Sequence, residues 1–224
     1  TGIMIKLLGW WLEHDTGYGH PERPDRLRAI EQVLEDESFQ FLHREEALLA
    51  DEEVIARMHG PEYIAALKKV APESGHCYVD GGDTVMSPKS WEAALRSAGA
   101  AVMAVDQVVT GAARNAFCAA RPPGHHAEMR QAMGFSFFNN VAIAAAHARE
   151  AHGLERVAVI DFDVHHGNGT QHMFWSEPNL FYGSSHQMPL FPGTGEWSEQ
   201  GVAGNIVNAP LRRGDDTYHF QEAF

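Results

Sequence analysis

Acidic and histidine side chains follow the apolar run 157–160, in the string DFDVHHGNGT at residues 161–170. Asp161, Asp163 and His165 alternate along the chain, so in extended backbone their side chains lie on one face. A carboxylate and an imidazole from one segment are ligands that zinc and iron accept, and a catalytic site leaves one position open for water. The alternative is that the acids cap the following helix and the histidines are ordinary loop residues.

A second histidine pair, His125 and His126, follows the segment RPPG at 121–124. Two prolines and a glycine stiffen this loop and let its backbone approach a ligand closely. Adjacent histidines at a metal site can share general acid–base catalysis, provided that each has a partner on its other ring nitrogen. Asp161 and Asn168 are available as these partners. A solvent-exposed loop would explain one such pair equally well, but two pairs at successive strand ends favour a catalytic metal site.

Two aromatic residues occur on glycine-containing segments after these motifs: Phe135 in MGFSFFNN (133–140) and Phe191 in PLFPGTGE (189–196). On loops at one end of a sheet they would wall a narrow apolar channel, whereas each taken singly also suits the core. The GTGE segment lacks the spacing of a phosphate-binding loop and its strand-to-helix context, so nucleotide binding is not indicated.

Strands and helices alternate along the chain, which predicts an open α/β sheet. The run 157–160 is apolar on both faces, as in a parallel sheet covered by helices on both sides. Ligands bind beyond the carboxyl ends of such strands, where both histidine motifs fall. The expected strands are 39–43, 115–120, 156–161, 179–185 and 205–210, and the expected helices are 51–60, 61–70, 87–111, 137–153 and the start of one in 214–224.

The composition is that of a single soluble domain: 224 residues, 44% hydrophobic and 21% charged, with no apolar run long enough to span a membrane. Two cysteines give no disulfide framework, so we expect a reducing, cytoplasmic setting. The net charge of -13 argues against non-specific binding of nucleic acid. It suits a cationic substrate such as an amine, or it serves solubility alone.

Together these motifs resemble the histone deacetylase family in the broad sense, which includes acetylpolyamine amidohydrolases and bacterial deacetylase-like amidohydrolases. The resemblance is carried by GHPERPDRLRAI (19–30), DGGDT (80–84), RPPGHHAEMRQAMGFSFFNN (121–140), DFDVHHGNGTQHMF (161–174) and LFPGTGE (190–196). Many members of the family carry Asp at the position of Asn168. An Asn at this position is similar to the class II and bacterial branch.

The resemblance implies a metal-dependent hydrolase with a three-layer arginase/deacetylase-like α/β fold and a central, mainly parallel sheet. Such an enzyme releases acetate from an acetyl-lysine peptide or an acetylpolyamine, with Zn2+ or Fe2+ as the catalytic metal. The implied roles are Asp163 and His165 as metal ligands, His125 and His126 as the catalytic pair, with His126 as the main base, and Asp161 and Asn168 as their orienting partners.

The substrate would be bound by Phe135 and Phe191 as tunnel walls, the Gly134 carbonyl, Asp83 at the rim and Arg26 near the cavity for acetate. A structural potassium ion would lie at Asp161, Ser184, Ser185 and the backbone of Asp163 and His165, with a second cation near the carbonyls of Phe174 and Leu180. These cations would compensate the acids at the strand end. The implied chemistry lowers the pKa of a metal-bound water from about 16 towards about 7, and the histidines move its proton.

The family's third metal ligand, an Asp in a GFDA-like segment, and its transition-state Tyr on a glycine-rich loop have no counterpart in residues 1–224. We therefore expect residues 1–224 to form a single catalytic domain that is incomplete at its C-terminal end, lacks the last strands, and is weakly active or inactive alone. Loss of one oxyanion-stabilising donor reduces rates about 100- to 1,000-fold. Exposed sheet edges also predict association.

Two other functions are alternatives to a deacetylase. A two-manganese ureohydrolase of the arginase type would need DAHxD-like ligands, which DFDVHHGNG does not match. A non-catalytic module that binds acyl-amines stays open, because the third ligand and the Tyr are absent. Zinc or iron, acetyl-lysine or acetylpolyamine, and monomer or homo-oligomer are likewise open.

Overall fold

The computed structural model describes residues 2–6 and 10–223. In chain order its elements are β1 (Gly2–Lys6), α1 (Trp10–Glu13), α2 (Asp25–Leu34), the 3-10 helix η1 (Glu37–Phe39), β2 (His43–Glu46), α3 (Glu52–Ile55), α4 (Pro61–Val70), β3 (Cys77–Tyr78), β4 (Val85–Met86), α5 (Ser90–Val109), β5 (Asn115–Ala119), α6 (Asn140–His152), β6 (Val157–Asp161), α7 (Asn168–Phe174), β7 (Leu180–Gln187), β8 (Ile206–Leu211) and α8 (Thr217–Ala223).

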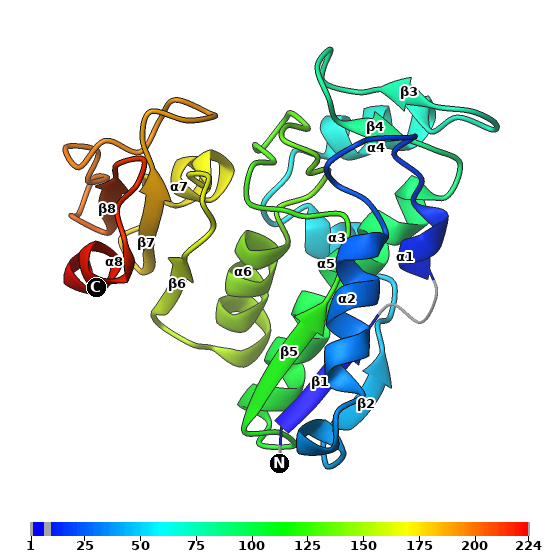
Figure 1. Ribbon diagram of the computed structural model, residues 1–224, viewed down its shortest axis with the longest axis horizontal. Helices are drawn as coiled ribbons and strands as arrows, with labels where there is room; N and C mark the ends of the chain where they lie inside the picture. The colour runs from blue at the N-terminus through cyan, green and yellow to red at the C-terminus, as the bar shows by residue number, and fades with distance from the viewer. Residues whose placement is uncertain (1, 7–9, 224) are drawn as a thin grey trace.

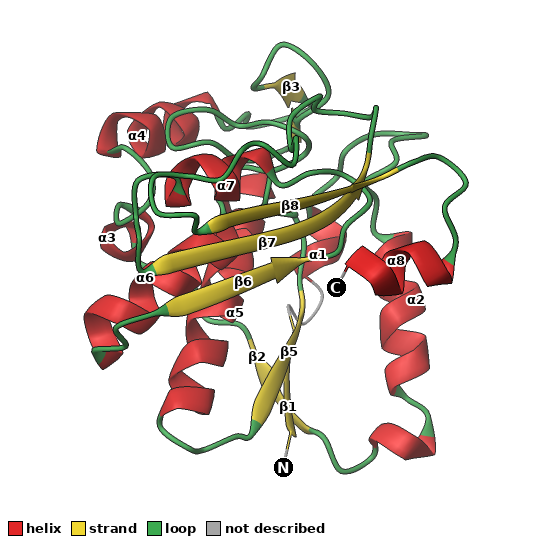
Figure 2. Ribbon diagram, turned by 90° about the vertical axis from the view of Figure 1, so that its left-hand side faces the viewer, coloured by secondary structure: helices red, strands yellow, loops and turns green. Residues whose placement is uncertain are grey.

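The parallel strands form two sheets, as Figure 2 shows. One sheet has the order β2-β1-β5 and the other the order β6-β7-β8, and every ladder within them is parallel. The short strands β3 and β4 pair separately as an antiparallel hairpin. The expected α/β class is therefore observed, but the expected single central sheet is divided, with β5 and β6 at its two inner edges.

Helices cover both faces of the first sheet (Figure 1): α5 packs against β1 and β5, and α2 contacts β5 on the other side. The long helix α5 also packs along α6 through small side chains such as Ala94 and Ala98. Gly99 of α5 lies directly against the backbone around Leu48, where a Cβ atom would overlap the carbonyl oxygen. Small residues thus let α5 approach its neighbours closely enough to fix the first sheet.

The second sheet is covered on one face only. Met173, Phe174 and Leu180 form a buried cluster with residues of α6 and with Tyr182 of β7. On β6 itself, Ile160 is half exposed, and Phe162 just beyond the strand is largely exposed. The prediction that the run 157–160 is buried on both faces is therefore wrong for the described residues, because β6 is an edge strand with no helix over its outer face.

Several predicted element boundaries need correction. The strand expected at 39–43 is wrong: Asp36 accepts a hydrogen bond from the backbone of Ser38 and begins η1, so β2 starts only at His43. Helix 51–60 ends already at Ile55. The other expected helices and strands are confirmed with shifts at their ends. No helix in the part of the chain that the structure describes has the length and apolarity needed to cross a membrane.

Candidate functional site

The two histidine motifs lie at the carboxyl ends of β5 and β6, where parallel strands direct the loops that follow them. The loop after β5 carries His125 and His126, and the turn after β6 carries Asp163 and His165. Asp161 closes β6 and is paired in register with Ser184 of β7. The strands of the second sheet therefore fix the turn against which the first loop packs.

Each histidine of the first pair has its own side-chain partner. His125 Nδ1 lies 2.8 Å from Asp161 Oδ2, and His126 Nδ1 lies 2.8 Å from Asn168 Oδ1. The two ring centroids are 4.0 Å apart. Asn168 Nδ2 donates to Glu128 Oε1 at 2.6 Å, which fixes the amide so that its oxygen faces His126. Both imidazoles are thereby held through Nδ1, and their Nε2 atoms remain for other partners.

The two histidines have opposite pKa shifts. Burial lowers the pKa of His126 to about 4, and the nearby charge of His125 adds to this effect. Burial also acts to lower the pKa of His125, but the hydrogen bond and negative charge of Asp161 outweigh it and raise that pKa. The pair therefore offers a neutral imidazole as a proton acceptor beside one that holds a proton more readily.

Asp163 and His165 contact each other in the turn after β6. His165 Nδ1 is 3.2 Å from Asp163 Oδ1, close to the distance of about 3.3 Å between two ligands of a tetrahedral zinc ion. Their side chains are 50% and 38% exposed, so an ion can reach them. The ring of His165 lies 5.9 Å from that of His126. Among the described residues, no third metal-ligating side chain converges with these two, so they fit two positions of a metal site.

Of the residues expected around a potassium ion, Asp161, Asp163 and Ser184 lie together. Asp161 Oδ1 accepts a hydrogen bond from the Asp163 backbone, and Asp161 pairs in register with Ser184. Ser185 Oγ is buried without a hydrogen-bond partner, and Ser184 Oγ contacts His186 Nδ1 at 2.9 Å. Ser184 shares a face with Asp161, while the Ser185 side chain points to the other face of β7, so the Ser184 hydroxyl and the Asp161 carboxylate are the side-chain oxygens suited to a monovalent cation here.

At the second expected cation position, the carbonyls of Phe174 and Leu180 already have a hydrogen-bond donor. The Asn205 side-chain amide donates to the carbonyls of Phe174 and Leu180, both at 2.9 Å, and to that of Glu177 at 3.2 Å. A neutral amide therefore already satisfies the carbonyl oxygens for which we expected a cation, and Asn205 is a residue that the sequence motifs did not reveal.

An aromatic ring and a glycine both contact His126. The ring of Phe191 packs edge-to-face on His126 with centroids 5.0 Å apart, and it remains half exposed. Gly134 has a φ of 54°, and a Cβ atom there would lie 2.7 Å from Cγ of His126. Only glycine leaves room for the imidazole at this backbone conformation. Phe135 follows with a φ of 67°, which is unusual for a non-glycine residue.

Phe135 is linked to the DGGDT segment at the outer end of the site. Its backbone N–H donates to Thr84 Oγ1 at 3.0 Å, and Asp80 in turn accepts from Thr84. The ring of His20 packs on Phe135 with centroids 4.7 Å apart, and His20 Nε2 lies 2.9 Å from the backbone oxygen of Asp83. Asp83 is exposed, and His20 connects its backbone to the Phe135 ring.

The Arg26 side chain is 44% exposed, and its guanidinium donates to the Ala120 carbonyl at 2.9 Å. Burial lowers the pKa of Arg26, and the charges of Glu22 and Asp163 partly oppose this. Beneath it, the fully buried Arg121 forms two hydrogen bonds of 2.8 and 2.7 Å with Glu22. This buried ion pair ties the loop before α2 to the RPPG segment.

Sequence reasoning missed Tyr182, which is buried and bonds Asp161 Oδ2 through its hydroxyl at 3.0 Å. The same hydroxyl accepts from the Gly167 backbone, so Tyr182 orients the carboxylate and the turn together. The sequence did offer one signal. Tyr182 lies two residues before Ser184 on the same predicted strand, so the two side chains share a face. Glu128 and His20 act through contacts that no local motif predicts.

Comparisons with known proteins agree with this geometry. The histone deacetylase domain model matches residues 20–224. An uncharacterised protein of Synechocystis is 42% identical over 96% of this chain and 71% of its own length. The histone deacetylase-like amidohydrolase of Pseudomonas aeruginosa is 38% identical over 92% of this chain but only 55% of its own length. The crystal structure of the HDA15 HD domain superposes with a TM-score of 0.87 at 34% identity, covering 94% of this chain and 63% of that one.

Proposed function

Because the chain belongs to the histone deacetylase family, we propose that it is the part of a deacetylase that carries the catalytic histidines and two metal ligands. The reaction would be hydrolysis of the amide bond of an acylated amine, with release of the carboxylate and the free amine. The observation that carries the proposal is the histidine pair, since each ring is held through Nδ1 by a separate acceptor beside Asp163 and His165.

In this proposal His126 acts as the main base and His125 as the proton donor. A bound zinc or iron ion would polarise the substrate carbonyl and acidify its water. His126, neutral at pH 7 because burial lowers its pKa to about 4, would accept the proton of the attacking water. His125, whose pKa Asp161 raises against the effect of burial, returns a proton to the leaving amine nitrogen. Asp161 and Asn168 are positioning residues.

The proposed substrate enters between Phe135 and Phe191 with its cationic part outside. The Gly134 carbonyl would accept the amide N–H of the substrate, and Asp83 would accept from an amine or a peptide backbone at the rim. Arg26 would bind the released acetate. The net charge of -13 supports a cationic amine, either a lysine side chain or a polyamine. Cys77 and Cys118 are both free thiols, which agrees with a reducing compartment such as the cytoplasm.

The test combines metal content with turnover in the longest natural form of the protein, because residues 1–224 alone are expected to be weakly active or inactive. Zinc and iron are measured by elemental analysis, and hydrolysis of a fluorogenic acetyl-lysine peptide is compared with that of an acetylated polyamine. We expect activity to be lost on chelation, regained with Zn2+ or Fe2+, and reduced about 1,000-fold or more in His126→Ala. His43→Ala, an exposed histidine on β2, is the matched control and should leave turnover unchanged.

Two other outcomes would redirect the proposal. Turnover that survives His126→Ala would overturn the assigned base. Binding of an acetylated amine with no turnover in the longest natural form of the protein would favour a non-catalytic acyl-amine binding module. The absence of a third converging ligand among the described residues is the observation that keeps this second function under test.

A further inference from the structure

A second group of metal-binding side chains lies away from this site, between α5 and α6. Asp106 Oδ1 is 2.7 Å from His147 Nε2 and also 2.7 Å from His152 Nε2. The three potential ligand atoms all lie within 4.8 Å of one another. The two imidazole rings are nearly perpendicular, with centroids 5.5 Å apart. We call these three residues the Asp106 cluster.

The helices hold the Asp106 cluster in place. Asp106 lies in the last turn of α5, and His147 and His152 lie in the second half of α6, which ends at Gly153 with a φ of 68°. The two helices pack along each other, so the cluster joins elements that are already rigid. One side is open: the Asp106 side chain is 46% exposed, while those of His147 and His152 are 11% and 18% exposed.

We infer that the Asp106 cluster is a second metal site, which binds one divalent ion of the zinc class. Two imidazole nitrogens and one carboxylate oxygen are a ligand set that zinc, cobalt and nickel accept, with water in the remaining position. The convergent ligands come from two rigid helices, and the exposed carboxylate gives an ion access. The Asp106 cluster shares no residue with the histidine pair and the ligands of the other site.

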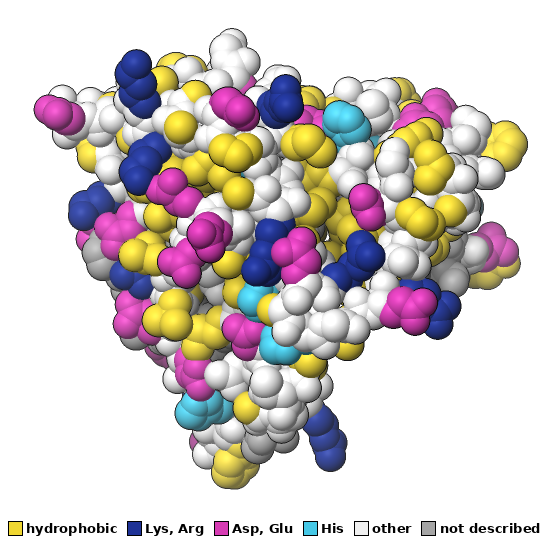
Figure 3. All heavy atoms as spheres, turned by 180° about the vertical axis from the view of Figure 1, so that it is seen from behind, with side chains coloured by type: hydrophobic (Ala, Val, Ile, Leu, Met, Phe, Trp, Pro, Cys, Tyr) yellow, Lys and Arg dark blue, Asp and Glu magenta, His cyan; other side chains and the backbone are white. Residues whose placement is uncertain are grey.

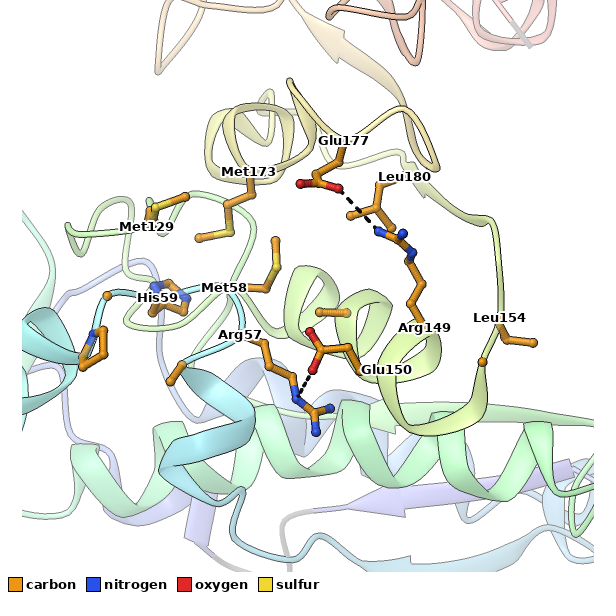
Figure 4. Close-up of a pocket in the computed structure, with 15 residues that line it drawn as sticks. Arg57, Met58, His59, Met129, Arg149, Glu150, Leu154, Met173, Glu177 and Leu180 are labelled. Atoms are coloured by element: carbon orange, nitrogen blue, oxygen red, sulfur yellow. Dashed lines mark hydrogen bonds and ion pairs between the residues drawn. The ribbon is translucent and has the colours of Figure 1, made fainter.

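Arg57 would compete with the ion. Its Nη1 lies 2.8 Å from His147 Nδ1, and a guanidinium can only donate, so this nitrogen accepts and Nε2 carries the proton. An ion on Nε2 requires the opposite tautomer, with the proton on Nδ1, which Arg57 then opposes. Arg57 is also paired with Glu150, with Nε 3.0 Å from Oε2 (Figure 4). It can therefore stay with Glu150 when His147 changes its tautomer.

The same arginine borders a cleft of about 540 Å³ whose lining includes Met58, Met129 and Met173. Figure 3 shows a face of the molecule on which acidic, basic and histidine side chains surround an apolar hollow. Metal binding at the Asp106 cluster would release Arg57 from His147 and so change the charge pattern at the border of this cleft.

The test measures binding of Co2+ and Zn2+ to the double variant Asp163→Ala/His165→Ala. This variant lacks the two metal ligands of the candidate functional site, so only the Asp106 cluster is tested. We expect one equivalent of Co2+ to bind with visible d–d absorption, and Zn2+ to displace it and raise the thermal unfolding midpoint. Adding His147→Gln/His152→Gln should abolish both effects, and Asp106→Asn, which keeps a hydrogen-bond acceptor, should weaken binding about 10- to 100-fold. His219→Asn removes a histidine from a surface Asp–His pair and is the matched control.

Arg57→Met provides a result that an adventitious surface site would not give. Because it removes the competitor of His147 Nδ1, we expect Co2+ to bind about tenfold more tightly. Absence of binding at millimolar Co2+, or binding that persists without both histidines, would overturn the inference. If Asp163→Ala/His165→Ala abolishes all metal binding, the result supports the proposed function and rejects the second site. Failure of the second site and failure of the proposed function are therefore distinguishable.

Discussion

At the scale of single residues, Asp161 contacts more groups of the candidate site than its sequence motif indicates. Its Oδ2 faces both His125 and the Tyr182 hydroxyl, and its Oδ1 accepts from the Asp163 backbone. Burial would raise the pKa of Asp161, but the hydrogen bond and charge of His125 outweigh it and lower that pKa. The carboxylate is therefore charged at neutral pH and stabilises the protonated form of His125.

Asp161→Asn should reduce kcat about 100-fold or more, because a neutral amide neither stabilises protonated His125 nor fixes its tautomer. Tyr182→Phe keeps the ring and removes one hydrogen bond to the same carboxylate, so we expect about a tenfold loss and about 1 kcal/mol of destabilisation. The measurement is kcat as a function of pH for both variants. Equal losses of kcat in Asp161→Asn and Tyr182→Phe would show that the negative charge of Asp161 does not contribute to turnover.

Gly134→Ala should disrupt the site by moving His126. The new Cβ would lie 2.7 Å from Cγ of the imidazole, and a displacement of about 1 Å at a catalytic group reduces rates about 100-fold. Gly193→Ala is the control, because Gly193 also has a positive φ but nothing lies within 4 Å of its Cβ position. Both variants should lose about 1–2 kcal/mol of stability from the backbone conformation. Activity should fall only in Gly134→Ala.

His59 predicts a pH dependence of stability. Burial lowers its pKa to about 4 from 6.5, so the unfolded chain takes up this proton at a higher pH than the folded chain does. The resulting stability is present above pH 6.5 and is lost as the pH falls towards 4. Between pH 7 and pH 5 the loss should be about 2 kcal/mol.

Urea unfolding of the protein and of His59→Gln at these two pH values measures this contribution. The variant should show a smaller pH effect by about that amount, whereas His43→Gln, on the exposed surface, should behave like the unchanged protein. The same pH effect in His59→Gln would mean that other buried groups account for all of it.

At the scale of elements, α6 begins at a residue that also anchors the site loop. Asn139 Oδ1 accepts from the Ala142 backbone as an N-cap, and its Nδ2 contacts Thr170 Oγ1 at 3.1 Å and the Ala127 carbonyl at 3.3 Å. Because Ala127 directly follows the histidine pair, one side chain joins α6, α7 and the loop after β5.

Asn139→Ala should therefore lower the free energy of unfolding by about 2–3 kcal/mol, the sum of a lost cap and lost buried hydrogen bonds. Asp36→Ala removes a cap on the exposed η1 and should lose about 1 kcal/mol or less. Chemical denaturation of both variants makes the comparison. A loss in Asn139→Ala no larger than in Asp36→Ala would indicate that the contacts to Thr170 and Ala127 contribute nothing.

The element scale also shows what the sequence could predict. The strands at 115–119, 157–161 and 206–211 are short apolar runs, and their composition alone identifies them. By contrast, β2 has the sequence HREE and is a strand only because it pairs with β1, which no local pattern reveals. The histidine partners were predictable because Asp161 and Asn168 belong to one motif. The contacts of Tyr182, His20 and Asn205 bring distant segments together and were not.

At the scale of the whole molecule, β5 and β6 are edge strands that face the space between the two sheets. Ile160 of β6 is about half exposed, and in the turn that follows the strand Phe162 is 73% and Val164 about half exposed. Unpaired backbone groups flanked by apolar side chains favour pairing with another chain. The chain as described should therefore associate as its concentration rises.

Ile160→Lys/Phe162→Glu should shift the molecule towards the monomer, because charges on an edge strand oppose pairing. Tyr18→Lys, which changes a fully exposed aromatic residue outside both sheets, should leave association unchanged. Sedimentation velocity over a concentration series measures the distribution. A chain that stays monomeric throughout, or variants that associate equally, would rule out the β6 edge as the contact.

The chain separation between the histidines and their partners has a consequence for synthesis. His125 precedes Asp161 by 36 residues and His126 precedes Asn168 by 42. On a ribosome that adds about 5–20 residues per second, the pair emerges roughly 2 to 8 seconds before the side chains that orient it. During that interval α5 and α6 can already pack, while the imidazoles stay hydrated. The histidine pair is thus oriented only after α5 and α6 have been synthesised, and the candidate site is complete only once β7 follows.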